Sequence, residues 1–470
     1  MKKIALLLVC LELFAFRVFA QFSTVTPLDP VAVTSDTKDK PQSKVWMHDG
    51  RFWTVLITGS GTFLYRLDGA AWKSMLKISA FTYGRADCKM NGNVNHILLY
   101  RGAASQLISV EYEPVSFTYK LWSKRTAPAN ITLDTGVETA TIDLDTKGRM
   151  WLASDGTTNV NVRWSDAPYT TWSAPVNLAT VMDDDICAVI ALPVAGKIGV
   201  MWSDQGTKRF GFKTHTDGAV PGTWSADEVP ASQSALNVGF GMADDHINMK
   251  AAADGTLYCA VKTGYNHTSY PRIALLVRRP TGAWDNLYEV ERQLGTRPIV
   301  LLNEDQNKIK VVYTASETGG NILYRESAIS PIAFGNQFTL INGTYNFATS
   351  CKQTYTASTV ILASTSTWAV GVTGTDQKPV TPNLKLELDA NPNPFSSLAT
   401  INYQLPEAGQ YSVSLYDHRG KKTTVLKQGN NLAGEKGKVT IDGSGMKRGM
   451  YLVRLQTNKE ARSLKLLHQK

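Results

Sequence analysis

Large aromatic residues recur at nearly constant spacing along most of this 470-residue chain. Each follows a strand-like run and a polar turn, as in LYRLDGAAW, VRWSDAPYTTW and LLVRRPTGAW. The recurring aromatics, 50 to 60 residues apart, are Trp72, Trp122, Trp172, Trp224, Trp284 and Phe338. A period of this size is typical of propellers, solenoids and repeat arrays.

The stretch from Glu138 to Trp172 shows what one repeat contains. Alternating runs at 139–144, 149–153 and 160–164 are separated by turns, the first of them Asp145 to Gly148. Alternation across such a turn predicts β-hairpins, and three or four strands per period fit a propeller blade. The closing aromatic is expected on the outer strand, wedged between neighbouring blades. Scattered tryptophans on a β-sandwich are the alternative, which the similar intervals disfavour.

The repeats predict an all-β fold built on a seven-bladed β-propeller. The blades are expected to start near Lys44, Arg85, Glu138, Asp183, Asp244, Arg297 and Ser350. The seventh blade has only three strand-like runs before Thr375, and the segment from Thr24 to Val33 can supply the fourth. Such closure matters because an open last blade would expose a sheet edge.

The first twenty residues have the pattern of a cleaved signal peptide. Two lysines precede an apolar run from Ile4 to Phe16, and Val18-Phe19-Ala20 forms a small-residue cleavage site. The apolar run is too short to span a bilayer, and no other run is long enough. The sequence therefore predicts export and no integral membrane segment.

Three segments follow the signal peptide: the propeller at 21–375, a linker at 376–383 and a small β domain at 384–470. The last holds 14 Lys and Arg against 7 Asp and Glu, and the propeller with its linker carries no net charge. The basic pI of about 9.1 therefore gives no reason to expect nucleic acid binding by the body. A monomer is expected.

Four cysteines remain after the predicted cleavage, and they fall in strands of blades 2, 4, 5 and 7. They are Cys88, Cys187, Cys259 and Cys351. Blades that are not neighbours cannot bring two Cα atoms within bridging distance, so we expect buried free thiols. No cysteine or histidine spacing indicates a metal site.

The C-terminal segment carries several short motifs in a fixed order. They are Asn393-Pro394-Phe395, Leu405-Pro406, Leu415-Tyr416-Asp417 with Gly420, Gly449-Met450-Tyr451 and a basic end at 465–470. In this order they closely resemble the type A C-terminal sorting domain of the type IX secretion system of Bacteroidetes. The resemblance implies an immunoglobulin-like β-sandwich that engages the type IX secretion machinery and crosses the outer membrane. It also implies a secreted or cell-surface protein, with removal of the domain.

The residues themselves agree with that resemblance. The alternating runs INYQL, YSVSLYD, KVTIDG and MYLVRLQT, broken by Pro and Gly turns, predict a small antiparallel sandwich. A carbohydrate-binding or adhesion module is the alternative. The propeller loosely resembles sialidase-type propellers with Asp-box turns, through Ser165-Asp166 and Trp172. The displaced Asp and the missing Gly depart from that family's pattern, so the likeness implies the fold and no sialidase activity.

In a propeller, the loops leading into the innermost strands share one face with the loops that join the second and third strands. We call this the funnel face, and it is the default binding site of the architecture. Its expected charged residues include Arg85, Asp184, Asp244, Asp245, His246 and Arg297. Blade 5 has the longest such loop, which carries Lys262, Tyr265, His267, Tyr270 and Arg272.

Two main hypotheses follow from that concentration of side chains. In the first, Tyr265 and Tyr270 stack on the sugars of an extracellular polysaccharide, while Lys262, Arg272 and Arg297 pair with its acidic groups. In the second, the protein is a polysaccharide lyase that eliminates across a uronate. The lyase would use His246 or His267 as base, Tyr265 or Tyr270 as acid, and Arg272 or Arg297 to neutralise the carboxylate.

Other readings of the same face stay open. Asp184 and Asp245 could serve a glycoside hydrolase, whose outcome depends on the carboxylate separation. The face could also bind a protein. The run Asp143 to Gly148 begins like a calcium loop but lacks the later acidic ligands, so a hairpin turn is expected there and no cofactor.

Overall fold

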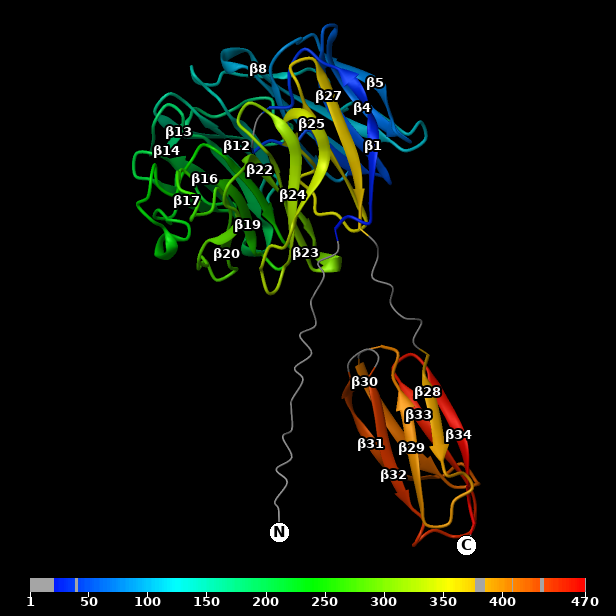
Figure 1. Cartoon of the computed structure of the whole chain (residues 1–470). Coiled ribbons are helices and arrows are strands. Elements are labelled where there is room, and N and C mark those ends of the chain that lie inside the picture. Colours follow the sequence, from blue (N-terminus) through cyan, green and yellow to red (C-terminus); the bar gives the residue numbers. More distant parts are fainter. Residues whose placement is uncertain (1–20, 39–40, 377–384, 408, 432–434, 470) are drawn as a thin grey trace, which may run out of the picture. The chain divides into compact units, whose positions relative to one another are not determined.

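The structure is a computed structural model that describes residues 21–38, 41–376, 385–407, 409–431 and 435–469 (Figure 1). The described residues divide into two compact units, with the division between Lys378 and Pro379. The expected signal peptide and residues 377–383 of the expected linker lie outside them. No helix among the described residues is long and apolar enough to cross a membrane.

Antiparallel sheets follow one another along the larger unit. Blade 1 contains β2 (Val45–His48), β3 (Arg51–Thr58), β4 (Gly61–Asp68) and β5 (Ala71–Ser79). Blade 2 contains β6 (Arg85–Asn91), β7 (Val94–Tyr100), β8 (Ser105–Glu113) and two short strands beside β8, β9 (Thr118–Leu121) and β10 (Ala129–Ile131). Blade 3 contains β11 (Ala140–Leu144), β12 (Met150–Asp155), β13 (Asn159–Ser165) and β14 (Val176–Thr180).

The pattern continues through the second half of the ring. Blade 4 contains β15 (Cys187–Leu192), β16 (Lys197–Asp204) and β17 (Arg209–Thr216). Blade 5 contains β18 (Ile247–Ala251), β19 (Leu257–Lys262), β20 (Ile273–Arg278) and β21 (Tyr288–Glu291). Blade 6 contains β22 (Thr296–Asn303), β23 (Lys308–Thr314), β24 (Gly320–Ala328) and the first part of β25 (Gln337–Thr349). Short 3-10 turns, η1 to η4, lie at Gly102–Ala104, Pro193–Ala195, Ser232–Ser234 and Glu304–Gln306.

Blade 7 joins the two ends of the propeller. Its inner strand is the end of β25, followed by β26 (Ser358–Ser364) and β27 (Trp368–Thr375). The outermost strand is β1 (Thr24–Ala32), which pairs antiparallel with β27 from Thr24 opposite Thr375 (Figure 1). The N-terminal segment therefore closes the ring as the sequence predicts. The inner strand starts before Ser350, because β25 runs from blade 6 into blade 7 without a break.

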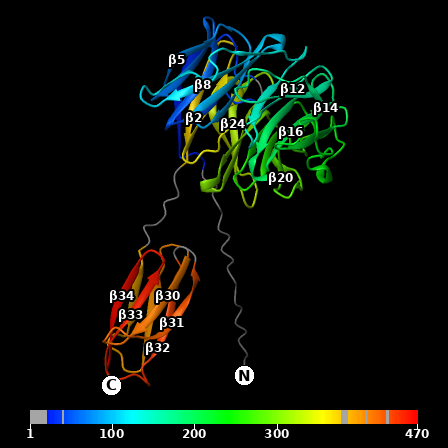
Figure 2. The ribbon, with the colours of Figure 1, turned by 180° about the vertical axis from the view of Figure 1, so that it is seen from behind.

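Bonds between innermost strands hold neighbouring blades together around the axis. The amide of Val189 in blade 4 donates to Thr141 of blade 3 at 2.9 Å, and that of Val300 donates to Asn248 at 3.0 Å. A parallel bridge from Val45 to Cys351 links blades 1 and 7. Figure 2 shows the sheets of the larger unit from behind. Buried hydrophobic clusters fill the space between each pair of successive blades.

Several recurring aromatics wedge between blades as expected. Trp224 of blade 4 meets Trp151 of blade 3 edge-on at 5.6 Å between ring centroids, and Trp284 of blade 5 meets Phe212 of blade 4 at 5.5 Å. All four cysteines of the body are free and buried, also as expected. The apolar residues that alternate in each repeat are thus buried between neighbouring sheets, which stabilises the fold.

The smaller unit is a β-sandwich. One sheet contains β28 (Glu387–Asn391), β29 (Leu398–Gln404) and β32 (Lys436–Asp442). The other contains β31 (Lys422–Asn431), β30 (Gly409–Tyr416), β33 (Gly449–Thr457) and β34 (Ala461–His468). Inward-facing residues of both sheets, such as Ile401, Val413 and Val453, form one core.

The opening motif of this unit is bound to its last strand. Asn393 donates to the carbonyl of Lys465 at 2.8 Å and accepts from the amide of Leu467 at 2.9 Å. Phe395 is buried, and its ring lies 4.8 Å from that of His468. The opening motif therefore holds the start of the domain to its last strand.

Candidate functional site

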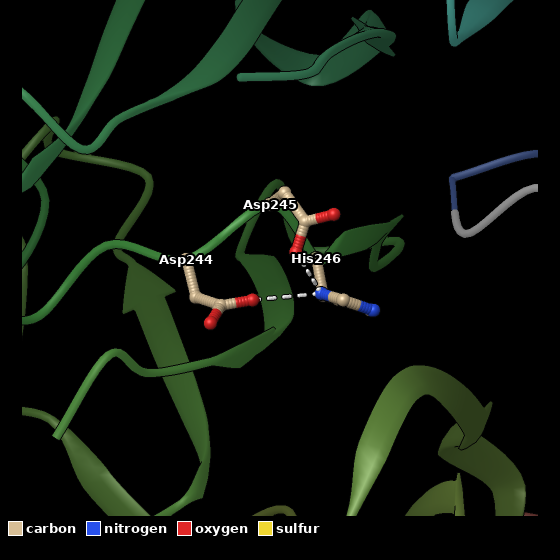
Figure 3. A group of neighbouring side chains, drawn as sticks. All are labelled: Asp244, Asp245 and His246. Atoms are coloured by element: carbon tan, nitrogen blue, oxygen red, sulfur yellow. Dashed lines mark hydrogen bonds and ion pairs between the residues drawn. The ribbon is translucent and has the colours of Figure 1, made fainter. Parts of the chain in front are cut away.

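The start of blade 5 brings a buried histidine between two carboxylates on the funnel face (Figure 3). His246 Nδ1 lies 2.8 Å from Asp244 Oδ1 and 2.5 Å from Asp245 Oδ1. Its Nε2 lies 3.1 Å from the hydroxyl of Thr296, the first residue of β22 in blade 6. The His246 side chain is only 2% exposed. Both ring nitrogens are therefore engaged within the protein.

Glu317 connects this histidine to the cations of blades 5 and 6. It lies in the turn between β23 and β24, 2.6 Å from Lys262 Nζ and 3.1 Å from Arg297 Nη1. The Thr296 hydroxyl donates to its Oε2 at 2.8 Å, and Arg272 approaches to 3.5 Å. Burial alone would raise the pKa of Glu317, but Lys262, Thr296 and His246 together hold it at about 2. The carboxylate therefore stays charged and fixes the cations around it.

The sequence patterns single out the cations of this network but not Glu317. They also single out Asp244, whose Oδ1 lies 3.1 Å from Lys262 Nζ. Glu317 stands in the short polar run SETGG, which looks like any other hairpin turn. Its only sequence signal is its position between the second and third strands of blade 6, where the turn reaches the funnel face.

A groove of about 300 Å³ lies next to this network, between blades 5 and 6. Residues 265–268 and Arg272 of blade 5 line one side, and residues 292–295 and 315–317 line the other. Arg272 and Arg292 contribute the positive charges of the lining, and Glu317 the negative one. The volume is at the lower end for small-ligand pockets.

The aromatic candidates of the blade 5 loop have different surroundings. Tyr265 is 3% exposed within the core between blades 4 and 5, and its hydroxyl accepts from the Leu236 amide at 3.0 Å. Burial raises the pKa of Tyr265. Tyr270 is partly buried against the same core, with its ring 5.8 Å from that of the exposed His267. Of the two tyrosines, Tyr270 is the one nearer to solvent.

Exposed aromatics on the funnel face escape the sequence patterns. Phe240 is 70% exposed in the loop leading into β18, and its amide donates to the carbonyl of Gly264 at 3.0 Å. That bond places Phe240 against the loop that forms the groove. Tyr83, in the loop before β6, and Trp368, the first residue of β27, are likewise exposed. Their sequence signal is an aromatic residue at or just before the start of a strand.

Three carboxylates from three successive blades approach one another near the axis. One oxygen from each of Glu138, Asp184 and Asp245 lies within 4.8 Å of the others. Arg85 donates to the backbone carbonyl of Glu138. Carboxylate oxygens are ligands that Ca²⁺ prefers, so this set could hold a cation. Asp244, Asp245 and His246 are equally close, but Lys262 and the imidazole already engage their oxygens.

The calcium-like run in blade 3 forms a hairpin turn. Asp145 Oδ1 accepts from the amides of Lys147 and Arg149, and its Oδ2 accepts from the indole of Trp151 at 3.1 Å. Asp143 forms an ion pair with Lys89. The acidic side chains of the run are therefore used by the turn and by the neighbouring blade.

Comparison with known proteins identifies the smaller unit. Residues 390–469 match the family described as the secretion system C-terminal sorting domain. The domain directs the protein across the outer membrane to the cell surface or exterior, and it does so through the type IX secretion machinery. No curated protein matches the chain.

The larger unit is distantly similar to several solved structures. The polysaccharide lyase Uly1 is 8% identical, with a TM-score of 0.47 over 76% of this chain and 100% of its own. A mutant of AofleA from Arthrobotrys oligospora is 10% identical, with a TM-score of 0.40 over 76% and 88% of the two chains. The α-L-arabinanase of Penicillium chrysogenum is 12% identical, with a TM-score of 0.41 over 66% and 100%. Similarity at this level says nothing about what the present chain binds.

Proposed function

We propose that the exported propeller binds an extracellular polysaccharide with acidic sugars in the groove between blades 5 and 6. One observation carries the proposal: the exposed ring of Phe240 belongs to a residue that is bonded to Gly264, and the loop residues that follow Gly264 line a groove with two arginines, Arg272 and Arg292. A sugar chain presents apolar C–H faces together with charged substituents. Phe240 offers a surface for the first, and the arginines of the groove for the second.

The two kinds of contact have separate physical roles. The ring face of Phe240 covers apolar sugar surface, and burying that ring stabilises the complex by about 1.5–3 kcal/mol. The guanidinium groups donate paired hydrogen bonds to carboxylate or sulfate oxygens. Glu317 contacts Arg272 and so holds one of these groups at the edge of the groove. Its low pKa keeps that contact intact at all physiological pH values.

Binding fits this geometry better than the elimination reaction with His246 as base. His246 is buried with both nitrogens engaged, and Tyr265 is also buried, with its hydroxyl accepting a hydrogen bond from the Leu236 amide. An elimination would instead use the exposed His267 together with the partly buried Tyr270, whose rings lie 5.8 Å apart. Replacing His267 by Ala would then abolish the ultraviolet absorbance of an unsaturated product.

A second candidate, glycoside hydrolysis, is favoured by the carboxylates Glu138, Asp184 and Asp245. Their oxygens lie within 4.8 Å of one another, which is nearer to the separation of about 5–5.5 Å in retaining glycosidases than to the wider one of inverting enzymes. Asp184 is the exposed member of the set. Release of reducing ends from a glycan by the mature chain, lost in Asp184→Asn, would support this candidate.

Affinity electrophoresis of the mature chain in gels containing acidic or neutral polysaccharides tests the binding proposal. We expect retardation by one acidic polysaccharide. Phe240→Ala and Arg272→Ala should each raise the dissociation constant about 10- to 100-fold. Phe117→Ala and Arg149→Ala, on the opposite face, are matched controls and should bind as the wild type does. Equal retardation of all four variants, or none by any acidic polysaccharide, would refute the proposal. Retention by a protein ligand alone would point to the protein-binding alternative.

A further inference from the structure

A second cavity lies on the propeller axis, away from the groove. It has a volume of about 180 Å³ and is enclosed by residues of the innermost strands of blades 2 to 7. The charged residues that line it are Lys89 in β6, Asp143 in β11, Lys250 in β18 and Lys352 after β25. Among the described lining residues, positive charges therefore outnumber negative ones.

Two of the three lysines have carboxylate partners. Lys89 pairs with Asp143, and Lys352 pairs with the buried Asp87 and donates to the carbonyl of Ile142 at 2.7 Å. Asp143 also accepts from the amide of Ala191 at 2.9 Å. Asp143 and Asp87 therefore neutralise Lys89 and Lys352, and neither forms an ion pair with the third lysine, Lys250.

Lys250 differs from the other two lysines. Only 4% of the residue is exposed, and its Nζ donates to the carbonyls of Cys351 and, at 2.8 Å, Gln353. Among the described residues, no carboxylate forms an ion pair with it. Burial, with smaller contributions from Lys352 and Lys89, lowers the pKa of Lys250 to about 7. A buried ammonium without a counter-charge is costly, and the protein meets that cost by partial loss of the proton.

We propose that this axial cavity is a binding site for a small tetrahedral oxyanion, held by Lys89, Lys250 and Lys352. The lysines line the cavity from three different blades, so an ion with several acceptor oxygens suits them better than one with a single acceptor. The cavity equals the liquid volume of about six water molecules, which is room for one such ion and some water. The bound ion supplies the negative charge that Lys250 lacks.

Isothermal titration of the full mature chain with sodium sulfate tests the proposal. Sodium chloride and sodium acetate at equal ionic strength serve as comparison arms. We expect one saturable sulfate site per chain and a larger rise in Tm with sulfate than with chloride or acetate. Affinity should fall as the pH rises through about 7, because Lys250 then loses its proton. Equal stabilisation by chloride or acetate would overturn the tetrahedral assignment.

Variants locate the site. Lys250→Met keeps an unbranched side chain, one atom shorter, and removes the ammonium, so we expect at least tenfold weaker sulfate binding and a loss of its pH dependence. Lys73→Met, at an exposed lysine of blade 1, is the matched control and should bind sulfate as the wild type does. Lys352→Gln gives an independent test if Lys250→Met does not fold. Unchanged sulfate affinity in either axial variant that folds would show that the ion binds elsewhere.

Discussion

Replacing Phe22 by Ala should weaken the closure of the propeller by a predictable amount. Phe22 precedes β1 and is 3% exposed between blades 6 and 7. Its ring lies 5.3 Å from that of Tyr324, and the buried Lys310 Nζ lies 4.3 Å from its centroid. Removing a buried phenylalanine side chain costs about 3–5 kcal/mol, because transfer and cavity terms add. Lys310 keeps its carboxylate partners, so no charge is left unpaired.

The expected shift in melting temperature follows from the size of the body. A propeller of about 350 residues has an unfolding entropy of about 0.7 kcal/mol/K, so a loss of 4 kcal/mol lowers Tm by about 5–6 °C. Differential scanning calorimetry of the mature chain measures this shift. Phe240→Ala is the matched control, since that ring is exposed, and should change Tm by less than about 1 °C. A shift for Phe22→Ala as small as that of the control would refute the role of Phe22 in closure.

Three further predictions concern charge, export and thiols. The lowered pKa of Glu317 contributes stability that is present above pH 4.5 and lost as the pH falls toward 2, so the drop in urea midpoint over that range should shrink in Glu317→Gln. Asn393→Ala removes two hydrogen bonds to the last strand, so we expect the sorting domain to be about 1–3 kcal/mol less stable. Immunoblots of the medium should then show less secreted protein. Unchanged secretion would contradict the coupling of the domain's two ends. The four body cysteines should resist a thiol reagent at pH 8 until urea unfolds the chain, because burial raises the pKa of each thiol; reaction of native protein would contradict it.

Periodicity in the sequence predicts most of the fold because each blade repeats the same local physics. Alternation, turn and closing aromatic recur together, so blade starts such as Arg85 and Asp244 lie close to observed strand starts. The continuous β25 is the exception, since Gln337 to Thr349 serves two blades. Its sequence contains the turn-like run INGT, and pairing with β24 and with β26 keeps the strand extended.

The candidate site is less predictable, because side-chain direction depends on contacts made in three dimensions. Sequence places Tyr265 and His267 two residues apart in one loop, yet one is buried and the other exposed. Glu317 and Phe240 come from separate turns that only the ring brings beside that loop. In the sequence, Lys250 looks like any alternating strand residue. Only the structure shows that no carboxylate of the described residues pairs with it.

The pairing of β1 with β27 also bears on how fast the body folds. Ser23 bonds to the carbonyl of Thr375 across 352 positions of sequence, so this contact has the longest separation that the propeller allows. Contacts of high sequence separation form slowly, because a large loop must close before they contribute. We expect the last kinetic step of folding to be the docking of the N-terminal strand. Until β27, residues 368–375, is in place, β1 has no strand to pair with. A chain that lacks residues 368–375 would therefore remain an open propeller that is prone to aggregate.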